Sequence, residues 1–450
     1  MKMSMFTNDL INFTSVLKMA ANFLGGRDYL KRQKFKERKK LISVVLPFSD
    51  LAFAAGAVPV FPIRMESFNI NQYLVALNSA TSFLGWGLTT KLLKFIKQFD
   101  ALKIFDSILD EVINSINVKY NEMYDLGVAN GISSDFCYGI KGLYGMHVSK
   151  GKNVDANLNF AIRCSAFNKY YESLRQIVPR QIWVDMPSRN IGNVLELLTT
   201  NITKAISELE DITGNMVTDN SLNKQFRIGN QVKRYYKTII YEISASDFYP
   251  CNPATFAEIL SLLGISFQDY NSNSQRYLEN IANLVKEMRA RIKKGIGMDV
   301  SKMPRVLFTP VFGGWEPESQ EFLYEQGVRT LYADWEILGL LDEIPVSKGT
   351  NPIEEYARFL LNATTNGIGC DNNTLTDSYL RIAKKMNVDG IIFNQLFGCH
   401  SLSNCYPMLR EKVRRKLEIP ITSINFNKIG ENVEQVKTRL GAYTEMFSTR

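Results

Sequence analysis

The sequence predicts an α/β fold, with a helical N-terminal region followed by two Rossmann-like parallel-sheet domains that face each other across a cleft. The main observation is an apolar run at residues 391–397, a basic helix at 406–417 and a second apolar run at 421–426. Apolar runs separated by a helix are typical of a β-α-β unit whose sheet is covered on both faces. The same order occurs in residues 158–186, so we expect two such sheets.

The length of the chain bounds the number of domains. With 450 residues, about two or three domains are expected, each large enough to bury its own core. Residues 1–130 are interpreted as a helical N-terminal region. Residues 131–295 are interpreted as the first α/β domain with a helical extension, and residues 296–450 as the second α/β domain.

In the N-terminal region, residues 12–23 and 91–124 carry apolar side chains at three- and four-residue spacing, which predicts helices. Between them, residues 46–61 read LPFSDLAFAAGAVPVF. Their small side chains allow a helix to pack closely on a neighbour before Pro59 ends it. Taken alone, this stretch is best explained as a tight packing element.

In the first α/β domain, the polar residues 133–135 are expected to cap a helix whose first turn contains Cys137. Cys164 then stands between a predicted strand and a predicted helix. These elements and the next strand are expected at residues 158–163, 167–176 and 181–186. Residues 191–295 are again helical, with breaks expected near Gly214, Gly229 and Pro253.

The second α/β domain opens with the strand sequence RVLFTPVF at residues 305–312. A glycine-rich loop then leads into a helix that Gly327 ends. The following strand and helices are expected at residues 328–333, 351–363, 373–386 and 433–447.

The net charge of +8 does not indicate a nucleic-acid partner. Residues 31–40 (KRQKFKERKK) hold seven basic residues against one acidic residue, an excess of six that leaves the rest of the chain at +2. An extended basic face is therefore not expected. The basic run is interpreted as a solvated helix face, with a docking surface for an acidic partner as the alternative.

The six cysteines are spread too widely for a disulfide framework, and no two form a CxxC pair of the kind found in zinc ribbons and ferredoxins. They are Cys137, Cys164, Cys251, Cys370, Cys399 and Cys405. The longest uncharged stretch, residues 67–90, is too polar for a membrane span. The N-terminus lacks the order of a signal peptide. We therefore expect a protein of the reducing cytoplasm without a membrane span.

Three cysteines could form one site. Cys164 and Cys399 each follow a predicted strand and face a helix N-terminus, where a thiolate is favoured. If the two domains face each other, these two thiols meet and Cys137 completes a triangle. Three thiolates can hold a [4Fe-4S] cluster and leave one iron open to substrate. On the residues alone, packing of free cysteines in the core remains the alternative.

Several segments, in this order, resemble those of the 2-hydroxyacyl-CoA dehydratase and benzoyl-CoA reductase family. They are LPFSDLAFAAGAVPVF, SSDFCYGIKGLYGM, LNFAIRCSAFNKYYESL with QIWVDMPSR, GGWEPESQEFLYEQGVRTLYADW, residues 388–427 and VEQVKTRLGAYTEMF. The resemblance spans residues 46–447. DFCYGIKGLYGM and NGIGCDNNTL look closest to the benzoyl-CoA reductase branch.

This resemblance implies a [4Fe-4S] cluster with Cys137, Cys164 and Cys399 as cofactor-binding and metal ligands. It implies a dehydratase (lyase) or reductase (oxidoreductase) of anaerobic metabolism that adds one low-potential electron to a CoA thioester or related small substrate. The implied partners are a homologous second subunit or a second copy in a dimer, and an ATP-dependent iron–sulfur activator or other low-potential electron donor. No catalytic acid or base is assigned.

The sequence departs from the family pattern at several positions. Asn425 and Asn427 replace the usual acidic residue after the last strand, and Asp50 stands where many members have Glu. His400 and Cys405, beside Cys399, either add a ligand or pack. Two alternatives therefore stay open. One is a non-catalytic or electron-transfer partner subunit, and the other is a zinc-binding or metal-free interaction protein of the same fold.

Overall fold

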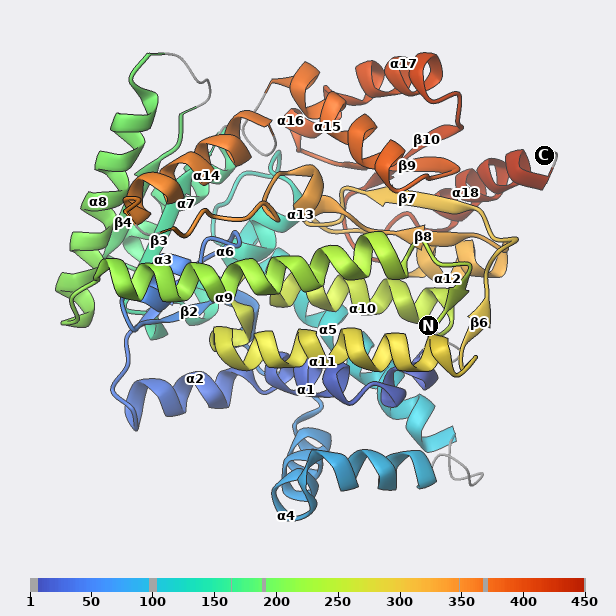
Figure 1. Ribbon diagram of the computed structural model, residues 1–450, viewed down its shortest axis with the longest axis horizontal. Coiled ribbons are helices and arrows are strands. Elements are labelled where there is room, and N and C mark those ends of the chain that lie inside the picture. The colour runs from blue at the N-terminus through green and yellow to red at the C-terminus, as the bar shows by residue number, and fades with distance from the viewer. Residues whose placement is uncertain are drawn as a thin grey trace.

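Two four-stranded parallel sheets form the framework of the protein (Figure 1). The computed structural model describes residues 7–96, 103–162, 164–187, 192–347, 349–366 and 371–448. The first sheet contains β1 (Leu41–Ser43), β2 (Val58–Val60), β3 (Ala156–Ala161) and β4 (Gln181–Asp185). The second contains β7 (Arg305–Thr309), β8 (Arg329–Leu331), β9 (Gly390–Leu396) and β10 (Ile421–Phe426). The predicted α/β class with parallel sheets is confirmed.

Both sheets have the same strand order. The first runs β2-β1-β3-β4 and the second β10-β9-β7-β8, so in each the third strand in sequence lies beside the first. β5 (Phe248–Tyr249) and β6 (Met298–Asp299) form a separate antiparallel pair. In open parallel sheets, ligands bind beyond the carboxyl ends of the strands where the order reverses. Here that point lies between β1 and β3 and between β7 and β9.

The N-terminal region is not only helical, because it supplies β1 and β2 to the first sheet. The expected helix in residues 46–61 is the short α3 (Asp50–Ala54), and Pro59 lies inside β2 opposite Ile42. Proline is tolerated there because β2 is an edge strand of the sheet. The N–H group that Pro59 lacks is not needed for a hydrogen bond to a neighbouring strand. The division of the chain into three domains stays a prediction.

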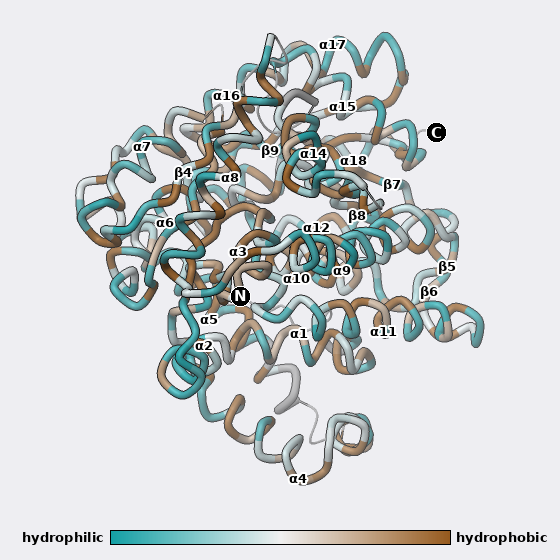
Figure 2. Tube along the Cα trace, turned by 60° about the vertical axis from the view of Figure 1, so that its left-hand side comes forward, coloured by the Kyte–Doolittle hydropathy of each residue, from teal (hydrophilic) through white to brown (hydrophobic). Residues whose placement is uncertain are grey.

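The N-terminal helices are η1 (Thr7–Asn12), α1 (Thr14–Leu24), α2 (Gly26–Phe35), α4 (Asn71–Ile96) and α5 (Lys103–Ala129). The single helix expected at residues 91–124 is therefore the end of α4 and most of α5; residues 97–102 lie outside the described part. α4 projects below the rest of the molecule and is kinked at Gly85, whose φ is +70° (Figures 1 and 2).

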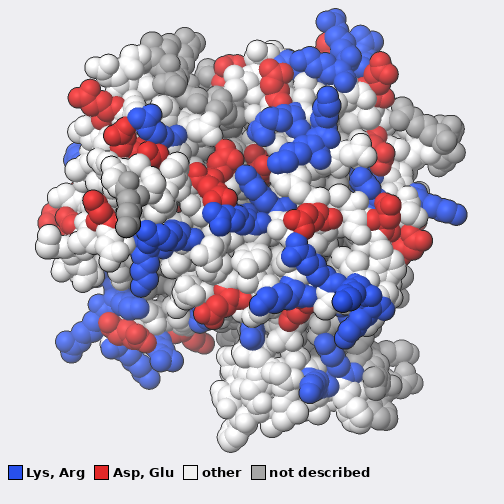
Figure 3. All heavy atoms as spheres, viewed as in Figure 1, with Lys and Arg blue, Asp and Glu red and all other residues white. Residues whose placement is uncertain are grey.

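α4 exposes an unusual amount of apolar surface. The side chain of Phe83 is 91% exposed, and further exposed apolar side chains are Val75, Leu84, Leu88, Leu92 and Phe95. Figure 3 shows few charged side chains on this lower lobe. Exposed apolar patches of this kind mark interaction surfaces.

The helices that surround the sheets largely agree with the predicted ones. They are α6 (Tyr138–Lys150), α7 (Ser165–Ser173), α8 (Val194–Thr213), α9 (Asp219–Thr238), α10 (Pro253–Ser266), α11 (Ser274–Lys293), α12 (Glu318–Glu325), α14 (Pro352–Asn366), α15 (Asn372–Lys385), α17 (Tyr406–Lys416) and α18 (Val433–Ser448). The shorter ones include η2 (Pro62–Met65), η6 (Ile239–Ile243), α13 (Asp334–Ile337) and α16 (His400–Ser403). No helix in the described ranges is long and apolar enough to cross a membrane.

Two of the three expected helix breaks are confirmed. Gly214 ends α8 with φ +71°, and Pro253 begins α10. Gly229, however, lies inside α9. A Cβ atom at this position would lie 3.2 Å from both the Asp50 Oδ1 and the Tyr270 hydroxyl, so the glycine leaves room for a buried carboxylate.

A buried ion pair joins the segment after β2 to the turn after α10. Arg64 Nη1 lies 2.6 Å from Asp269 Oδ2, and the two side chains are 1% and 0% exposed. The same carboxylate oxygen accepts the Phe61 N–H at 2.9 Å. Hydrogen bonds of this kind are needed because removing both charged groups from water otherwise costs more free energy than the attraction between the two charges provides.

His147, one of two histidines in the chain, is fully buried beneath the first sheet. Its Nε2 lies 2.9 Å from the Ser43 hydroxyl, and its Nδ1 lies 3.0 Å from the Leu143 carbonyl oxygen and 3.1 Å from the Tyr170 hydroxyl. Burial lowers the pKa of His147 to about 4. It is therefore a neutral core residue.

The His147 environment predicts acid sensitivity. The pKa of His147 is lower in the folded protein than in the unfolded chain. The contribution of His147 to the stability of the fold is therefore complete above pH 6.5 and is lost as the pH falls from 6.5 toward 4. The unfolding free energy of wild type, relative to His147→Gln, should fall by about 1.4 kcal/mol per pH unit in this window. Urea unfolding between pH 5 and 8 measures this, with the exposed His400→Gln as the matched control. A pH-independent difference between wild type and H147Q would contradict the prediction.

Candidate functional site

Four cysteines in the described part of the chain occupy helix N-cap positions: the three predicted ligands and Cys405, which precedes α17. Cys137 precedes α6, Cys164 precedes α7 and Cys399 precedes α16. Cys164 and Cys399 also stand in the same topological place, three residues after the last residue of the third strand of each sheet. The predicted order of strand, cysteine and helix is thus confirmed in both sheets. The polar residues 133–135 do not cap α6; the chain turns there, and Cys137 takes the N-cap position.

Backbone amides of the first helical turn act on each sulfur. The N–H groups that lower the cysteine pKa values are those of Gly139 and Ile140 for Cys137, Ala166 and Phe167 for Cys164, and Leu402 for Cys399. Burial acts more strongly in the opposite direction. It raises the pKa of Cys137 to about 11 and that of Cys399 to about 12, and it also raises the pKa of Cys164. Without a compensating cation, the three thiols therefore keep their protons.

The cysteine segments come together at the carboxyl ends of the strands. The charges of Cys137 and Cys164 both contribute to the raised pKa of Cys399, after burial. Gly398 has a φ of +74°, and a Cβ atom there would lie 2.9 Å from the Cys137 backbone nitrogen. The segments that carry Cys399 and Cys137 thus touch through their backbones, and a side chain at position 398 would separate them.

The N-terminus of α6 also packs on the second sheet. A Cβ atom at Gly139 would lie 3.2 Å from the Gly313 carbonyl oxygen, in the loop after β7. The Tyr138 ring meets the ring of Phe426, at the end of β10, edge-on with centroids 5.2 Å apart. The helix that leads into the first sheet therefore begins against the carboxyl ends of strands of the second.

Asp334 fixes the loop after β7 and was missed by sequence reasoning. Its carboxylate accepts the Thr309 hydroxyl at 2.7 Å and the N–H groups of Val311 and Phe312 at 2.6 and 3.0 Å. Burial raises its pKa to about 6. An acidic residue shortly after a predicted strand was the available signal. Asp334 holds the loop against which Gly139 packs.

Lys141 is the second residue that sequence reasoning missed. Its side chain is 2% exposed, and its Nζ donates to the Tyr124 hydroxyl at 3.2 Å. The same Nζ lies 4.9 Å from the centroid of the Tyr124 ring and 5.7 Å from that of Phe397. Its position one helical turn after Cys137 was the signal, because residues four apart share a helix face.

A cavity of about 420 Å³ opens beside these residues. It is lined by Tyr124, Asp125, Val128, Ala129, Ser134, Asp135, Lys141, Phe397 and Asn427. Asp135 and Phe397 are each two residues before a cysteine of the site. The cavity therefore borders the segments that carry Cys137 and Cys399.

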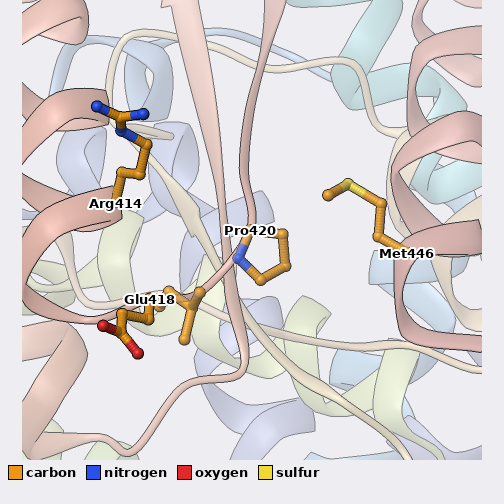
Figure 4. Close-up of a pocket in the computed structure, with 5 residues that line it drawn as sticks. Arg414, Glu418, Pro420 and Met446 are labelled. Atoms are coloured by element: carbon orange, nitrogen blue, oxygen red, sulfur yellow. The ribbon is translucent and has the colours of Figure 1, made fainter. Parts of the chain in front are cut away.

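A second hollow, of about 370 Å³, lies at the other end of the second sheet. Arg414, Glu418, Ile419, Pro420 and Met446 line it. Figure 4 shows Arg414 and Glu418 on one side, Met446 on the other and Pro420 between them. Pro420 precedes β10, so this hollow is at the amino end of the strand and apart from the cysteines.

The other candidate residues lie elsewhere or pack. Cys405 is 0% exposed and donates its thiol hydrogen to the Leu402 carbonyl at 3.0 Å, whereas His400 is exposed. Cys251 is buried after β5, and Cys370 lies outside the described residues. Asp50 is buried and accepts a hydrogen bond from Gln225 at 3.0 Å, so its carboxylate is used inside the fold.

Across the ranges that the structure describes, no group of three or more His, Cys, Asp or Glu side chains lies close enough to hold one metal ion. A cubane cluster binds each cysteine through a different iron atom, so its ligands stand further apart than those around a single ion. The prediction that Cys137, Cys164 and Cys399 are ligands remains a prediction.

A comparison with protein-family models identifies the chain's relatives. The model of the 2-hydroxyglutaryl-CoA dehydratase D-component matches residues 50–447. The chain belongs to this family. The predicted resemblance to 2-hydroxyacyl-CoA dehydratases is confirmed, whereas the benzoyl-CoA reductase branch stays a prediction. The matched range includes the three cysteine segments and both sheets of this dehydratase-family chain, except β1. A search of curated proteins found no match.

Proposed function

We propose that this dehydratase-family chain is an iron–sulfur enzyme subunit whose Cys137, Cys164 and Cys399 hold a [4Fe-4S] cluster between two facing α/β domains. The observation that carries the proposal is the equivalent place of Cys164 and Cys399, three residues after the third strand of each sheet, together with the backbone contact between the Cys399 and Cys137 segments. Soft thiolate ligands suit iron–sulfur clusters. The N-termini of α6 and α7, which have 13 and 9 residues, would offset the negative charge of such a group.

A bound cluster would supply low-potential, one-electron reduction, with one iron free for the substrate because only three protein ligands are present. The chain's own contribution is to place the thiols, to provide amides at each sulfur and to border the 420 Å³ cavity. The family name favours a CoA thioester as substrate and dehydration as the reaction. Reduction, as in the benzoyl-CoA reductase branch, is the other outcome.

A non-catalytic or electron-transfer subunit is the second candidate. Cys405 favours it, because its charge contributes to the raised pKa of Cys399, so a fourth thiol lies near the site. Four cysteine ligands would close the cluster to substrate and suit electron transfer. Against this, the Cys405 thiol already donates to the Leu402 carbonyl.

Metal analysis of anaerobically purified protein tests the proposal. We expect iron and acid-labile sulfide in equal amounts, close to four of each per chain. Turnover would then be assayed with a 2-hydroxyacyl-CoA thioester, an ATP-dependent iron–sulfur activator and a reductant. Bound zinc, or protein that takes up neither iron nor sulfide on reconstitution, would support the interaction-protein alternative and refute the cluster.

The exposed face of α4 predicts a stable assembly with a homologous chain or a second copy. The variant Phe83→Asp/Leu88→Asp places two charges on this face and should shift the protein to the monomer in sedimentation velocity at micromolar concentration. The matched control is Met216→Asp, at another apolar side chain, which is 82% exposed. This control variant should leave the sedimentation of the protein unchanged. Wild-type protein that sediments as a monomer, both alone and with a co-expressed homologous chain, would contradict the prediction.

A further inference from the structure

Lys141 is a buried cation whose charge is not neutralised within the chain. Its side chain is 2% exposed, and no carboxylate among the described residues forms an ion pair with it. The Nζ of Lys141 contacts the hydroxyl and the ring face of Tyr124 and the ring face of Phe397. Phenol and ring contacts stabilise an ammonium only in part. A buried charge left in this state is costly unless another group balances it.

The two carboxylates that line the same cavity do not neutralise Lys141. Asp125 pairs with Lys428 at 2.6 Å. Asp135 is exposed to solvent and contacts the cavity from its rim. Neither carboxylate therefore pairs with Lys141, whose ammonium is left available to a negative group that binds beside the cavity.

The position of Lys141 points to the cysteine site. Its backbone N–H donates to the Cys137 carbonyl at 3.1 Å, so it lies one turn into the helix that Cys137 begins. Its aromatic neighbour Phe397 is two residues before Cys399. The charge of Lys141 also lowers the pKa of Cys137, although burial raises that pKa more.

The close packing of α5 on α6 fixes the backbone that carries Lys141. α5 and α6 cross at Gly127 and Gly145 with no room for side chains. A Cβ atom at Gly127 would overlap the Lys141 carbonyl oxygen, and one at Gly145 would overlap the Met123 carbonyl oxygen. This close crossing fixes the face of α6 that carries Lys141 against the C-terminal part of α5.

We propose that Lys141 is a positioning residue that balances the negative charge of the cluster at Cys137, Cys164 and Cys399. The inference rests on the proposed function. A cluster core held by three thiolates carries net negative charge, and this charge increases by one when an electron is added. A fixed cation nearby therefore stabilises the reduced form more than the oxidised form. Lys141 makes the cluster easier to reduce.

Redox titration of anaerobically reconstituted protein, followed by electron paramagnetic resonance, tests this role. Lys141→Met removes the charge but keeps the length, and Lys141→Arg keeps the charge. At a fixed potential, K141M should lower the ratio of reduced to oxidised cluster about tenfold, which is about 59 mV for a one-electron couple. K141R should stay close to wild type. Lys150→Met, at the opposite end of α6, is the matched control and should also stay close to wild type.

The outcomes separate the inference from the function on which it rests. Wild-type protein that binds no iron refutes both. K141M that binds iron and keeps the wild-type midpoint refutes the inference alone and makes Lys141 a packing residue. If K141M does not fold, as judged by circular dichroism, Lys141→Gln replaces it under the same criteria. A lowered midpoint in the neutral variants, restored in K141R, supports the inference.

Discussion

Cys399→Ser is expected to lose most of its bound iron and all turnover while keeping its fold. The residue stands where the backbone after β9 meets the Cys137 segment, so its thiol is central to the proposed ligand set. The fold should survive because β9 is held by the apolar contacts of Ile391, Ile392 and Phe393, which are all fully buried. Iron content, turnover and far-ultraviolet circular dichroism of the anaerobic variant measure the three effects.

Two other cysteines serve as comparisons for Cys399. Cys251→Ala should keep both iron and activity, because this buried thiol lies after β5 and outside the site. Cys405→Ala separates two ligand sets. If it also empties the site, four cysteines bind the cluster and electron transfer becomes the better interpretation. Wild-type iron content in the Cys399 variant would refute the three-cysteine site.

Arg64→Met is expected to lower the unfolding free energy by about 3–5 kcal/mol, because it leaves the Asp269 carboxylate buried without its cation. The change removes a 2.6 Å pair with both side chains at most 1% exposed. Arg234→Met is a matched control: its pair with Glu343 is also 2.6 Å long, but the side chains are 63% and 42% exposed. The control should lose no more than about 1 kcal/mol.

Urea unfolding followed by fluorescence measures both arginine variants under the same conditions. Equal losses in the buried and the exposed variant would show that burial does not set the strength of these pairs. A large loss for Arg64→Met that Asp269→Asn partly restores in the double variant would assign the cost to the unpaired carboxylate.

The strands of the second sheet were predictable, and two strands of the first were not. β9 and β10 lie within the runs predicted at residues 391–397 and 421–426, whose apolar side chains and flanking helix locate them. β1 and β2 have only three residues each, too few to show a period, and β2 contains Pro59. Pro59 is acceptable in β2 because β2 is an edge strand, and which strand lies at the edge is known only once the sheet is assembled.

The cysteines of the candidate site could be selected from the sequence, but their surroundings could not. Cys164 and Cys399 each follow an apolar run, and this local pattern is visible in the sequence. The environment of Lys141 comes from Tyr124 on another helix and from Phe397 in the other half of the chain. Asp334 likewise gains its role only through the loop after β7. Local spacing marks both positions in the sequence, but it does not identify the distant segments that they contact.

The repeated strand order has a consequence for the symmetry of the candidate site. Because both sheets have one topology, Cys164 and Cys399 stand in equivalent places. The helices before the third strands, α6 and α15, are equivalent in order as well, but their N-caps differ: Cys137 in one and Asp371, whose carboxylate accepts the N–H groups of Asn373 and Thr374, in the other. Cys137 therefore has no counterpart in the second sheet, and a group held by all three thiols would present two chemically different sides.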